Sequence, residues 1–102
     1  MDIERTLQER GERYGDFTVH AALAQDLQLC LRSADAWDYR LTPVQRQALM
    51  VITDKIARIL TGDPNYADNW HDIQGYAKLV EDRLPPVSPA HAAPVDADDI
   101  PF

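Results

Sequence analysis

Residues 42–62 read TPVQRQALMVITDKIARILTG, and this stretch decides the fold because it predicts one long helix. Thr42 offers a capping hydroxyl and Pro43 suits the first helical position, so the helix should begin here. It should run to about Leu60, because Gly62 can close it. Its main apolar face comprises Ala48, Leu49, Ile52, Ile56, Ile59 and Leu60, and Met50, Val51 and Ala57 lie largely outside that face. A helix with apolar residues all round is central in its fold or is covered by a second copy of the chain.

Three further helices are predicted around this one. A short helix covers about residues 2–13, and a second helix, which Thr18 can cap, runs to about residue 33. The last begins at Ala67 or Asp68 and ends near Leu84, before two prolines. Apolar residues recur at helical spacing in the two longer ones, at Val19, Leu23, Leu27, Cys30 and Leu31 and at Trp70, Ile73, Tyr76, Ala77, Val80 and Leu84. We therefore expect an all-α protein, a small bundle of one short N-terminal helix and three main helices.

Four residues of this predicted head carry more specific expectations. Residues 34–41 should form a connection from which Trp37 and Tyr39 fold back onto the core. Cys30 is the only cysteine and falls on a helix, so a buried, inert thiol is expected. Gly75 lies inside the last helix, where a glycine costs about 1 kcal/mol relative to alanine. Such a glycine usually marks the close approach of another helix or a ligand.

Composition and charge limit the possible functions. The chain has 102 residues, of which 45% are hydrophobic, enough for one domain with one modest core. Its net charge is −7, and three Asp after residue 84 leave a head that is still acidic. An acidic head argues against direct binding to nucleic-acid phosphates, which requires clustered Lys and Arg. Because no signal peptide and no apolar run of bilayer length is evident, we expect no membrane association and a place in the cytoplasm of a bacterial host cell.

The chain divides into three predicted parts. Residues 1–84 form the helical head. Residues 85–95 contain four prolines and mostly small residues, and should form a disordered Pro/Ala-rich tether. Residues 96–102, DADDIPF, form an acidic and apolar tip. Ile100 and Phe102 gain free energy only by leaving water, so we expect another protein to bury them.

The chemistry of the tip defines how it should bind. Pro101 fixes its own φ and biases Ile100 toward extended backbone, so less entropy is lost on docking. The Phe102 ring can fill an apolar pocket, while its α-carboxylate accepts a bidentate hydrogen bond from an Arg at the pocket lip. The acidic side chains of the tip would meet a basic rim of the partner, which raises the association rate more than the affinity. The predicted partner-binding residues are Asp96, Asp98, Asp99, Ile100, Pro101 and Phe102.

The run from Asp98 to Phe102, DDIPF, resembles the C-terminal tip of bacterial single-stranded DNA-binding protein, which ends in an acidic run and Asp-Ile-Pro-Phe. That tip recruits replication, repair and recombination proteins through a pocket for its Pro-Phe end. The resemblance therefore implies host proteins of these classes as partners. Nothing upstream resembles the oligonucleotide-binding barrel of that family. The alternative is a generic acidic tail, which does not account for Ile-Pro-Phe at this place.

A second resemblance covers most of residues 10–84. It rests on residues 13–17 (RYGDF), 54–59 (DKIARI) and 68–77 (DNWHDIQGYA). These motifs resemble a family of small uncharacterised phage and prophage helical proteins. That family is similar to phage domains associated with nucleotide modification, and more distantly to the all-helical MazG-like nucleotide pyrophosphohydrolases.

MazG-like enzymes hold Mg²⁺ against a triphosphate with acidic residues on two adjacent helices. By resemblance, the metal ligands here would be Asp54, Asp68 and Asp72, with Lys55 and Arg58 contacting phosphate. The paired glutamates of the enzymes' first metal-binding helix are absent, which leaves room for nucleotide binding without turnover. Structural roles are the alternative: Asp68 as a helix cap, Asp54 paired with Arg58, and Asp72 paired with Lys55 or Arg58. His20 and His71 are expected at the surface or in packing rather than as ligands.

We therefore predict an interaction protein of phage type, which binds host replication, repair or recombination proteins through its tip. The alternatives are a Mg²⁺-dependent MazG-like pyrophosphohydrolase and a nucleotide-binding oligomer without catalysis. No catalytic residue is assigned, and no cofactor is expected unless the enzyme alternative holds. The apolar helix of residues 43–60 predicts a homo-oligomer that self-associates through Met50, Val51 and Ala57.

Overall fold

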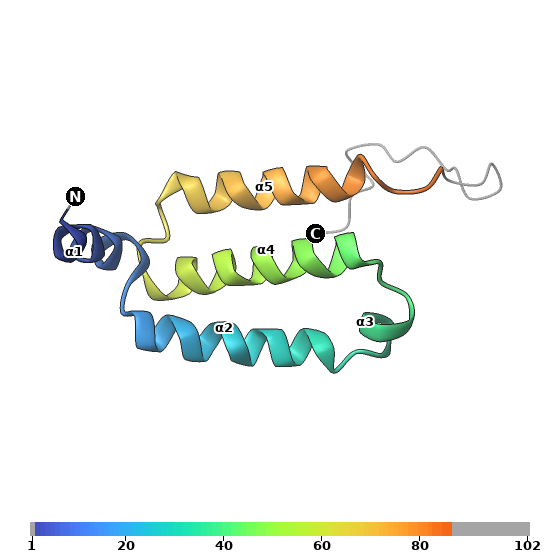
Figure 1. The fold of residues 1–102 in the computed structure, drawn as a ribbon, viewed down its shortest axis with the longest axis horizontal. Helices are drawn as coiled ribbons and strands as arrows, with labels where there is room; N and C mark the ends of the chain where they lie inside the picture. Colours follow the sequence, from blue (N-terminus) through green and yellow to red (C-terminus); the bar gives the residue numbers. More distant parts are fainter. Residues whose placement is uncertain (1, 87–102) are drawn as a thin grey trace.

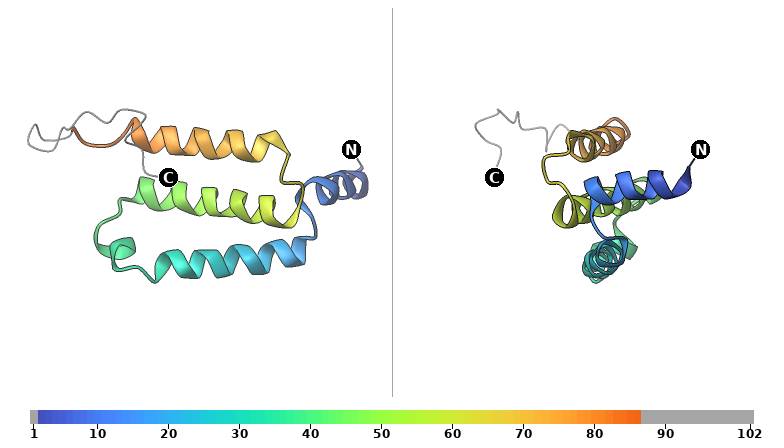
Figure 2. Two further views of the ribbon diagram at one scale, coloured as in Figure 1. Left: turned by 180° about the vertical axis from the view of Figure 1, so that it is seen from behind. Right: turned by 90° about the vertical axis from the view of Figure 1, so that its left-hand side faces the viewer.

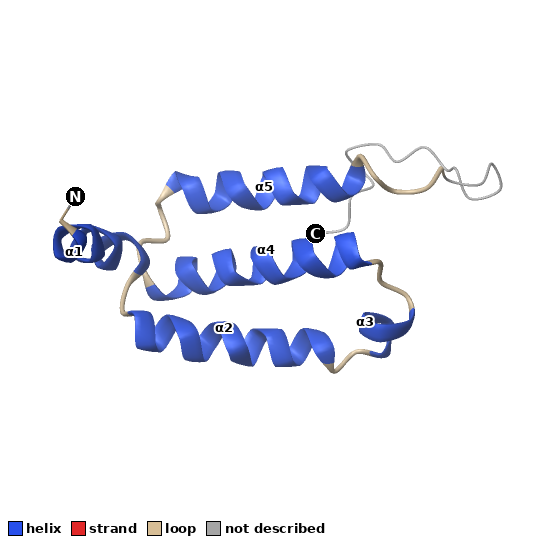
Figure 3. Cartoon of the chain, in the orientation of Figure 1, coloured by secondary structure: helices blue, strands red, loops and turns tan. Residues whose placement is uncertain are grey.

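The computed structural model describes residues 2–86. They form five helices, α1 (Ile3–Tyr14), α2 (Phe17–Arg32), α3 (Asp35–Tyr39), α4 (Pro43–Thr61) and α5 (Ala67–Glu81). Within these residues there is no strand (Figure 3), so the prediction of an all-α fold is confirmed. The tip at residues 96–102 and almost all of the predicted tether lie outside the described residues.

Helix α4 occupies the centre of the molecule (Figure 1). It packs against both α2 and α5 and lies between them, so the three long helices form a layer rather than a closed bundle. Helix α3 connects α2 to α4 at one end of this layer, and α1 lies across the other end (Figure 2). The central position of α4 confirms one of the two outcomes predicted for a helix with apolar residues all round, namely that it lies at the centre of its own fold.

The helix boundaries follow from local capping. At the start of α4, the Thr42 hydroxyl accepts a hydrogen bond from the Gln45 N–H at 3.1 Å, and the Gln45 side chain accepts one from the Thr42 N–H at 2.9 Å. This capping box, followed by Pro43, matches the predicted start. The predicted cap of α2 by Thr18 is wrong. Asp16 caps this helix instead, because its carboxylate accepts from the Thr18 N–H at 2.8 Å and so lets the helix begin two residues earlier.

A tight backbone contact fixes the corner between α1 and α2 to the end of α4. The Asp63 N–H donates to the Arg13 carbonyl at 2.7 Å, and the Thr61 hydroxyl donates to the Tyr14 carbonyl at 3.1 Å. Gly15 has a positive φ of 80°, and a Cβ at this position would overlap the Thr61 carbonyl. A glycine is therefore required here both by its backbone conformation and by the close approach of two chain segments.

The interior of the layer is small. Its buried apolar residues are Ala24, Trp37, Ala48 and Ala57. The predicted apolar faces of α2 and α5 are only partly covered, since Val19 is 56% exposed and Trp70 is 52% exposed. A layer covers each outer helix on one side only, so much of the apolar surface that the sequence predicts as buried remains accessible to water.

Four expectations for single residues are corrected. Trp37 folds back onto the core as predicted, but Tyr39 is exposed. Both residues lie on the short helix α3, where side chains two residues apart point in different directions. Cys30 is exposed, because it lies outside the contact between α2 and α4. Ala57 is completely buried rather than outward-facing, since α4 is covered on two sides. A Cβ at Gly75 would meet nothing within 4 Å, so no helix of the described chain approaches it closely.

Candidate functional site

Helix α4 carries most of the head residues singled out by the sequence, and it directs them to different neighbours. Asp54 contacts His20 of α2, whereas the adjacent Lys55 contacts Asp72 of α5. Successive residues on a helix are rotated by about 100°, which explains why neighbours in sequence reach opposite partners. Arg58 lies one turn after Asp54 and pairs with it, as residues four apart on a helix can.

His20, Asp54 and Arg58 form a continuous chain of hydrogen bonds. The His20 Nε2 lies 2.9 Å from the Asp54 Oδ1, and because a carboxylate only accepts, this nitrogen is the donor. The Arg58 Nε donates to the Asp54 Oδ2 at 3.1 Å. His20 is 8% exposed, and its Nδ1 has no hydrogen-bond partner within the described residues. Asp54 thus connects α4 to α2 through Oδ1, while its Oδ2 accepts from Arg58 within α4.

Two aromatic rings flank this chain. The Arg58 guanidinium lies 4.7 Å from the centre of the Tyr14 ring, a cation–π distance. The Phe17 ring stacks on the His20 imidazole at 6.2 Å with 27° between the planes. One face of the Phe17 ring lies on the imidazole. Phe17 is nevertheless 79% exposed, so the other face of the Phe17 ring is open to solvent.

Lys55 and Asp72 form a separate pair that connects α4 to α5. The Lys55 Nζ lies 2.9 Å from the Asp72 Oδ2. This hydrogen bond and the positive charge of Lys55 hold the pKa of Asp72 below its ordinary value of 3.8. The pairing agrees with one of the structural roles that the sequence left open for Asp72.

Asp68 belongs to a third group, around Tyr66. The Tyr66 hydroxyl donates to the Asp68 Oδ2 at 2.7 Å, and this hydrogen bond raises the pKa of Tyr66 above 10.0. Arg13 donates to the same hydroxyl at 3.1 Å, and its guanidinium lies 5.0 Å from the Tyr66 ring centre. Tyr14 meets that ring edge-on at 5.7 Å. Asp68 lies in the first turn of α5 but does not cap it, because Tyr66 is the N-cap residue.

A cavity of about 590 Å³ opens beside these groups, between α1 and the start of α2. Arg10, Tyr14, Phe17, His20 and Arg58 are among the residues that line it. Two arginines together with aromatic rings can accept a planar group that carries negative charge. The cavity volume lies in the range of small-molecule sites, which is about 300–1,000 Å³.

The three carboxylates proposed as metal ligands are not assembled into one site. Asp54 is engaged by His20 and Arg58, Asp72 by Lys55, and Asp68 by a tyrosine hydroxyl. In residues 2–86 no group of three or more His, Cys, Asp or Glu side chains is placed to hold a metal ion. Two of the carboxylates also face cations that would compete with Mg²⁺, so the geometry does not fit the metal-dependent alternative.

Sequence reasoning missed His20 as the partner of Asp54, and it missed Asn69. The signal for His20 was its position on the buried stripe of α2, since it lies four residues before the buried Ala24. Asn69 is 1% exposed, and its side-chain amide has no hydrogen-bond partner among the described residues. An asparagine next to the exposed Trp70 gave no comparable sign of burial.

The predicted partner-binding residues 96–102 lie outside the described residues, so no geometry can be assigned to them. No helix within residues 2–86 combines the length and apolar character needed to cross a bilayer. The family described as a domain of unknown function, DUF6378, matches residues 3–84, which is more than half of the chain. The chain therefore belongs to the DUF6378 family. No curated protein and no solved structure matches it.

Proposed function

We propose that this DUF6378 protein is an interaction protein of phage type, which binds host replication, repair or recombination proteins through residues 96–102. The observation that supports the proposal is the sequence DDIPF at residues 98–102, which resembles the tip of single-stranded DNA-binding protein. In this proposal Phe102 carries a free α-carboxylate, so that its ring and its charge enter the partner's pocket together. Binding of this kind recruits the host protein or keeps it from its usual partner.

The head has a supporting role in this proposal. Its last helix ends at Glu81, at the opposite end of the layer from α1 (Figure 1). The tip is therefore joined to the end of the molecule that lies away from the His20–Asp54–Arg58 chain.

The test is deletion of Phe102 alone. A pull-down from bacterial lysate identifies the partner, and the Kd is then measured with the purified partner for the intact and shortened chains. Burying a Phe side chain contributes about 1.5–3 kcal/mol and a charge-assisted hydrogen bond about 1.5–3 kcal/mol. Loss of both should raise the Kd about 100-fold or more, with unchanged helicity.

Asp98→Asn with Asp99→Asn gives the matched comparison. This double variant keeps the ring and the terminal carboxylate and removes only two negative charges. We expect a smaller loss of affinity, seen in the association rate and mainly at low salt. Equal affinity of the intact chain and the chain lacking Phe102 would refute the proposal.

We propose homo-oligomerisation of the head as part of this function. It is favoured by the large hydrophobic side chains that the described chain leaves exposed, among them Ile56, Leu60 and Trp70. A head with so few buried large side chains gains little stability from its own core. A second copy that covers this surface would supply the missing burial.

The second candidate function is nucleotide binding without catalysis. The observation that favours it is the cavity lined by Arg10, Arg58 and aromatic rings. A nucleoside triphosphate that binds there should raise the melting temperature by mass action, with Mg²⁺ present or absent, and Arg58→Gln should abolish the rise. An unchanged melting temperature across the common nucleotides, with no pyrophosphate released, would exclude both nucleotide binding and hydrolysis.

A further inference from the structure

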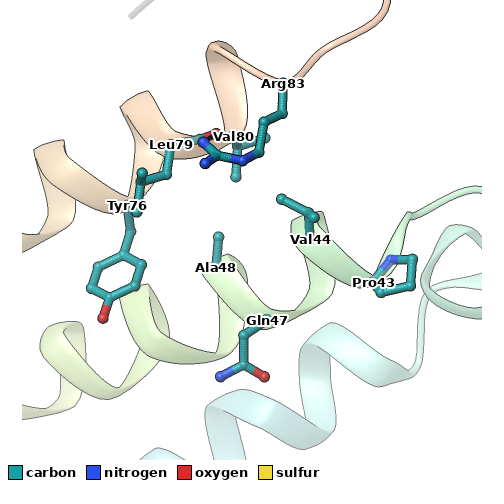
Figure 4. Close-up of a pocket in the computed structure, with 8 residues that line it drawn as sticks. All are labelled: Pro43, Val44, Gln47, Ala48, Tyr76, Leu79, Val80 and Arg83. Carbon is teal, nitrogen blue, oxygen red and sulfur yellow. Dashed lines mark hydrogen bonds between the residues drawn. The ribbon is translucent and has the colours of Figure 1, made fainter.

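A groove of about 410 Å³ lies between the start of α4 and the end of α5 (Figure 4). Its apolar surface is formed mainly by Val44 and Ala48 of α4 and by Leu79 and Val80 of α5. Val44 is 45% exposed and Leu79 is 47% exposed, so these side chains can be covered further. An apolar groove of this size is suited to bind one large hydrophobic side chain with its neighbours.

Arg83 lies at the rim of the groove, where Figure 4 shows its guanidinium extending over Val80. One of its nitrogens, Nη1, donates to the Leu79 carbonyl at 2.9 Å, which fixes the side chain in this position. Arg83 forms no ion pair within residues 2–86, whereas the adjacent Asp82 is neutralised by Lys78 at 2.9 Å. The groove therefore combines an apolar floor with one cation that still has donors to offer.

We propose that this groove binds the tip of the same chain, residues 96–102. The Phe102 side chain lies against Val44, Leu79 and Val80, and the carboxylates of Asp98 and Asp99 receive hydrogen bonds from Arg83. The match is one of chemistry, because an apolar ring close to carboxylates needs an apolar surface with a cation at its edge. The inference uses the same residues as the proposed function, but it does not depend on any host partner.

The path of the chain favours this occupant over others. Leu84 and Pro85 line a smaller hollow of about 150 Å³, which shares Val44, Val80 and Arg83 with the groove. The chain thus leaves the head directly beside the groove. The residues from 87 to 102 can span up to about 50 Å when extended, many times the distance needed to return. A short tether also gives the tip a local concentration in the millimolar range, so a weak contact is enough for occupancy.

Occupancy of the groove would regulate the tip. A host protein that needs Phe102 must compete with Val44, Leu79 and Arg83 for it. The apparent affinity for the host protein is then reduced by the fraction of chains whose tip is free. A variant that empties the groove should bind its partner more tightly than the natural chain does.

The test compares the intact chain with the chain lacking Phe102 by amide NMR. Deletion of Phe102 should shift the amide signals of Val44, Ala48, Leu79 and Val80. A peptide of residues 96–102, added to the shortened chain, should reverse these shifts. The Kd of this peptide for the shortened chain should be at least tenfold lower than its Kd for the intact chain, because the tip of the intact chain competes for the groove. Changes confined to residues after Leu84, or equal peptide Kd values on the two chains, would overturn the inference.

Charge reversal at Arg83 gives an independent arm. Arg83→Glu in the chain lacking Phe102 should weaken peptide binding at least tenfold, whereas Arg32→Glu, the same change at the exposed end of α2, should leave it unchanged. Equal peptide binding by the two variants would reject the role of Arg83. If a host protein requires Phe102 for binding but deletion of Phe102 shifts no amide signal of the groove, this inference alone is overturned. If the groove signals shift but no host protein binds the tip, the proposed function is left unsupported.

Discussion

The two ends of the helical layer carry opposite kinds of surface. At the end near α1, charged and aromatic side chains contact one another across four helices, through pairs such as Asp54–Arg58 and Lys55–Asp72. At the other end, α4 begins and α5 ends around an apolar groove with Arg83 as its only cation among the residues that line it. At the first end the charged side chains of α4 are engaged in ion pairs, while the second end leaves both apolar surface and the Arg83 cation accessible to a ligand.

This difference shows where binding to another molecule is easiest. A ligand at the α1 end must compete with hydrogen bonds of 2.9–3.1 Å that already hold Asp54. A ligand at the groove displaces only water from apolar side chains, which is favourable. The groove end is also the end from which the chain continues toward residues 96–102. The groove is therefore the surface where a ligand would displace the fewest existing hydrogen bonds, whereas Asp54 and Lys55 connect α4 to its two neighbouring helices.

The largest effect on stability is expected at the α1 end, from Gly15→Ala. The new Cβ would overlap the Thr61 carbonyl, and alanine would be strained at the positive φ of 80°. We expect the unfolding free energy to fall by about 2–4 kcal/mol. Urea unfolding measures this change. If the variant and the wild type have the same midpoint urea concentration, the close contact of Gly15 with the end of α4 does not contribute to stability.

Gly11→Ala is the matched control for this variant. Gly11 lies inside α1, and a Cβ there meets nothing within 4 Å. The same chemical change should therefore raise stability by about 0.5–1 kcal/mol, because alanine is the better helix former.

An intermediate effect is expected for self-association. Leu49, Ile56 and Leu60 recur along one stripe of α4, and Leu60 is 63% exposed. Leu60→Glu should weaken association at least about tenfold, because a charge would enter an apolar interface. The sequence also predicts that Val51→Glu gives a soluble monomer, although Val51 is already half-buried within one chain.

Sedimentation of the wild type and both variants measures this effect. Leu29→Glu is the control, because Leu29 is 69% exposed on α2 and lies apart from that stripe. A monomeric wild type would remove self-association from the proposal.

The smallest effect concerns Asp72. Because Lys55 lowers its pKa in the folded state, this carboxylate adds stability above its ordinary pKa of 3.8 and loses that contribution as the pH falls through the lowered pKa. Lys55→Met should return the pKa of Asp72 toward 3.8 and flatten the acid limb of the stability curve. Carboxylate NMR titration checks this, with Lys78→Met as the control because Lys78 pairs with Asp82. An Asp72 pKa that does not move would show that Lys55 is not its partner in solution.

Sequence patterns predicted the helices better than their contacts. Capping chemistry placed the start of α4 at Pro43, because Thr42, Pro43 and Gln45 act within a few residues. Burial was predicted less well, since periodicity tells which residues share a face but not whether a neighbouring helix covers it. Val19 and Trp70 lie on predicted faces yet stay half exposed, because a layer offers each outer helix one neighbour rather than two.

The candidate sites show the same limit. The pairs Asp54–Arg58 and Lys55–Asp72 were among the predicted alternatives, the first because residues four apart on a helix meet and the second because α4 and α5 form a hairpin. The contact between His20 and Asp54 joins residues far apart in sequence, so only the packing of α2 on α4 reveals it. The groove likewise depends on how the start of α4 packs beside the end of α5, which no local pattern encodes.

The central claim is that residues 98–102 act as the tip of single-stranded DNA-binding protein does. The most direct measurement is displacement of a labelled peptide ending in Asp-Asp-Ile-Pro-Phe from a purified host protein that recognises that tip. The intact chain should displace the peptide completely, and the chain lacking Phe102 should need about 100-fold more protein to do so. Equal displacement by the two chains, or none by the intact chain, would contradict the account.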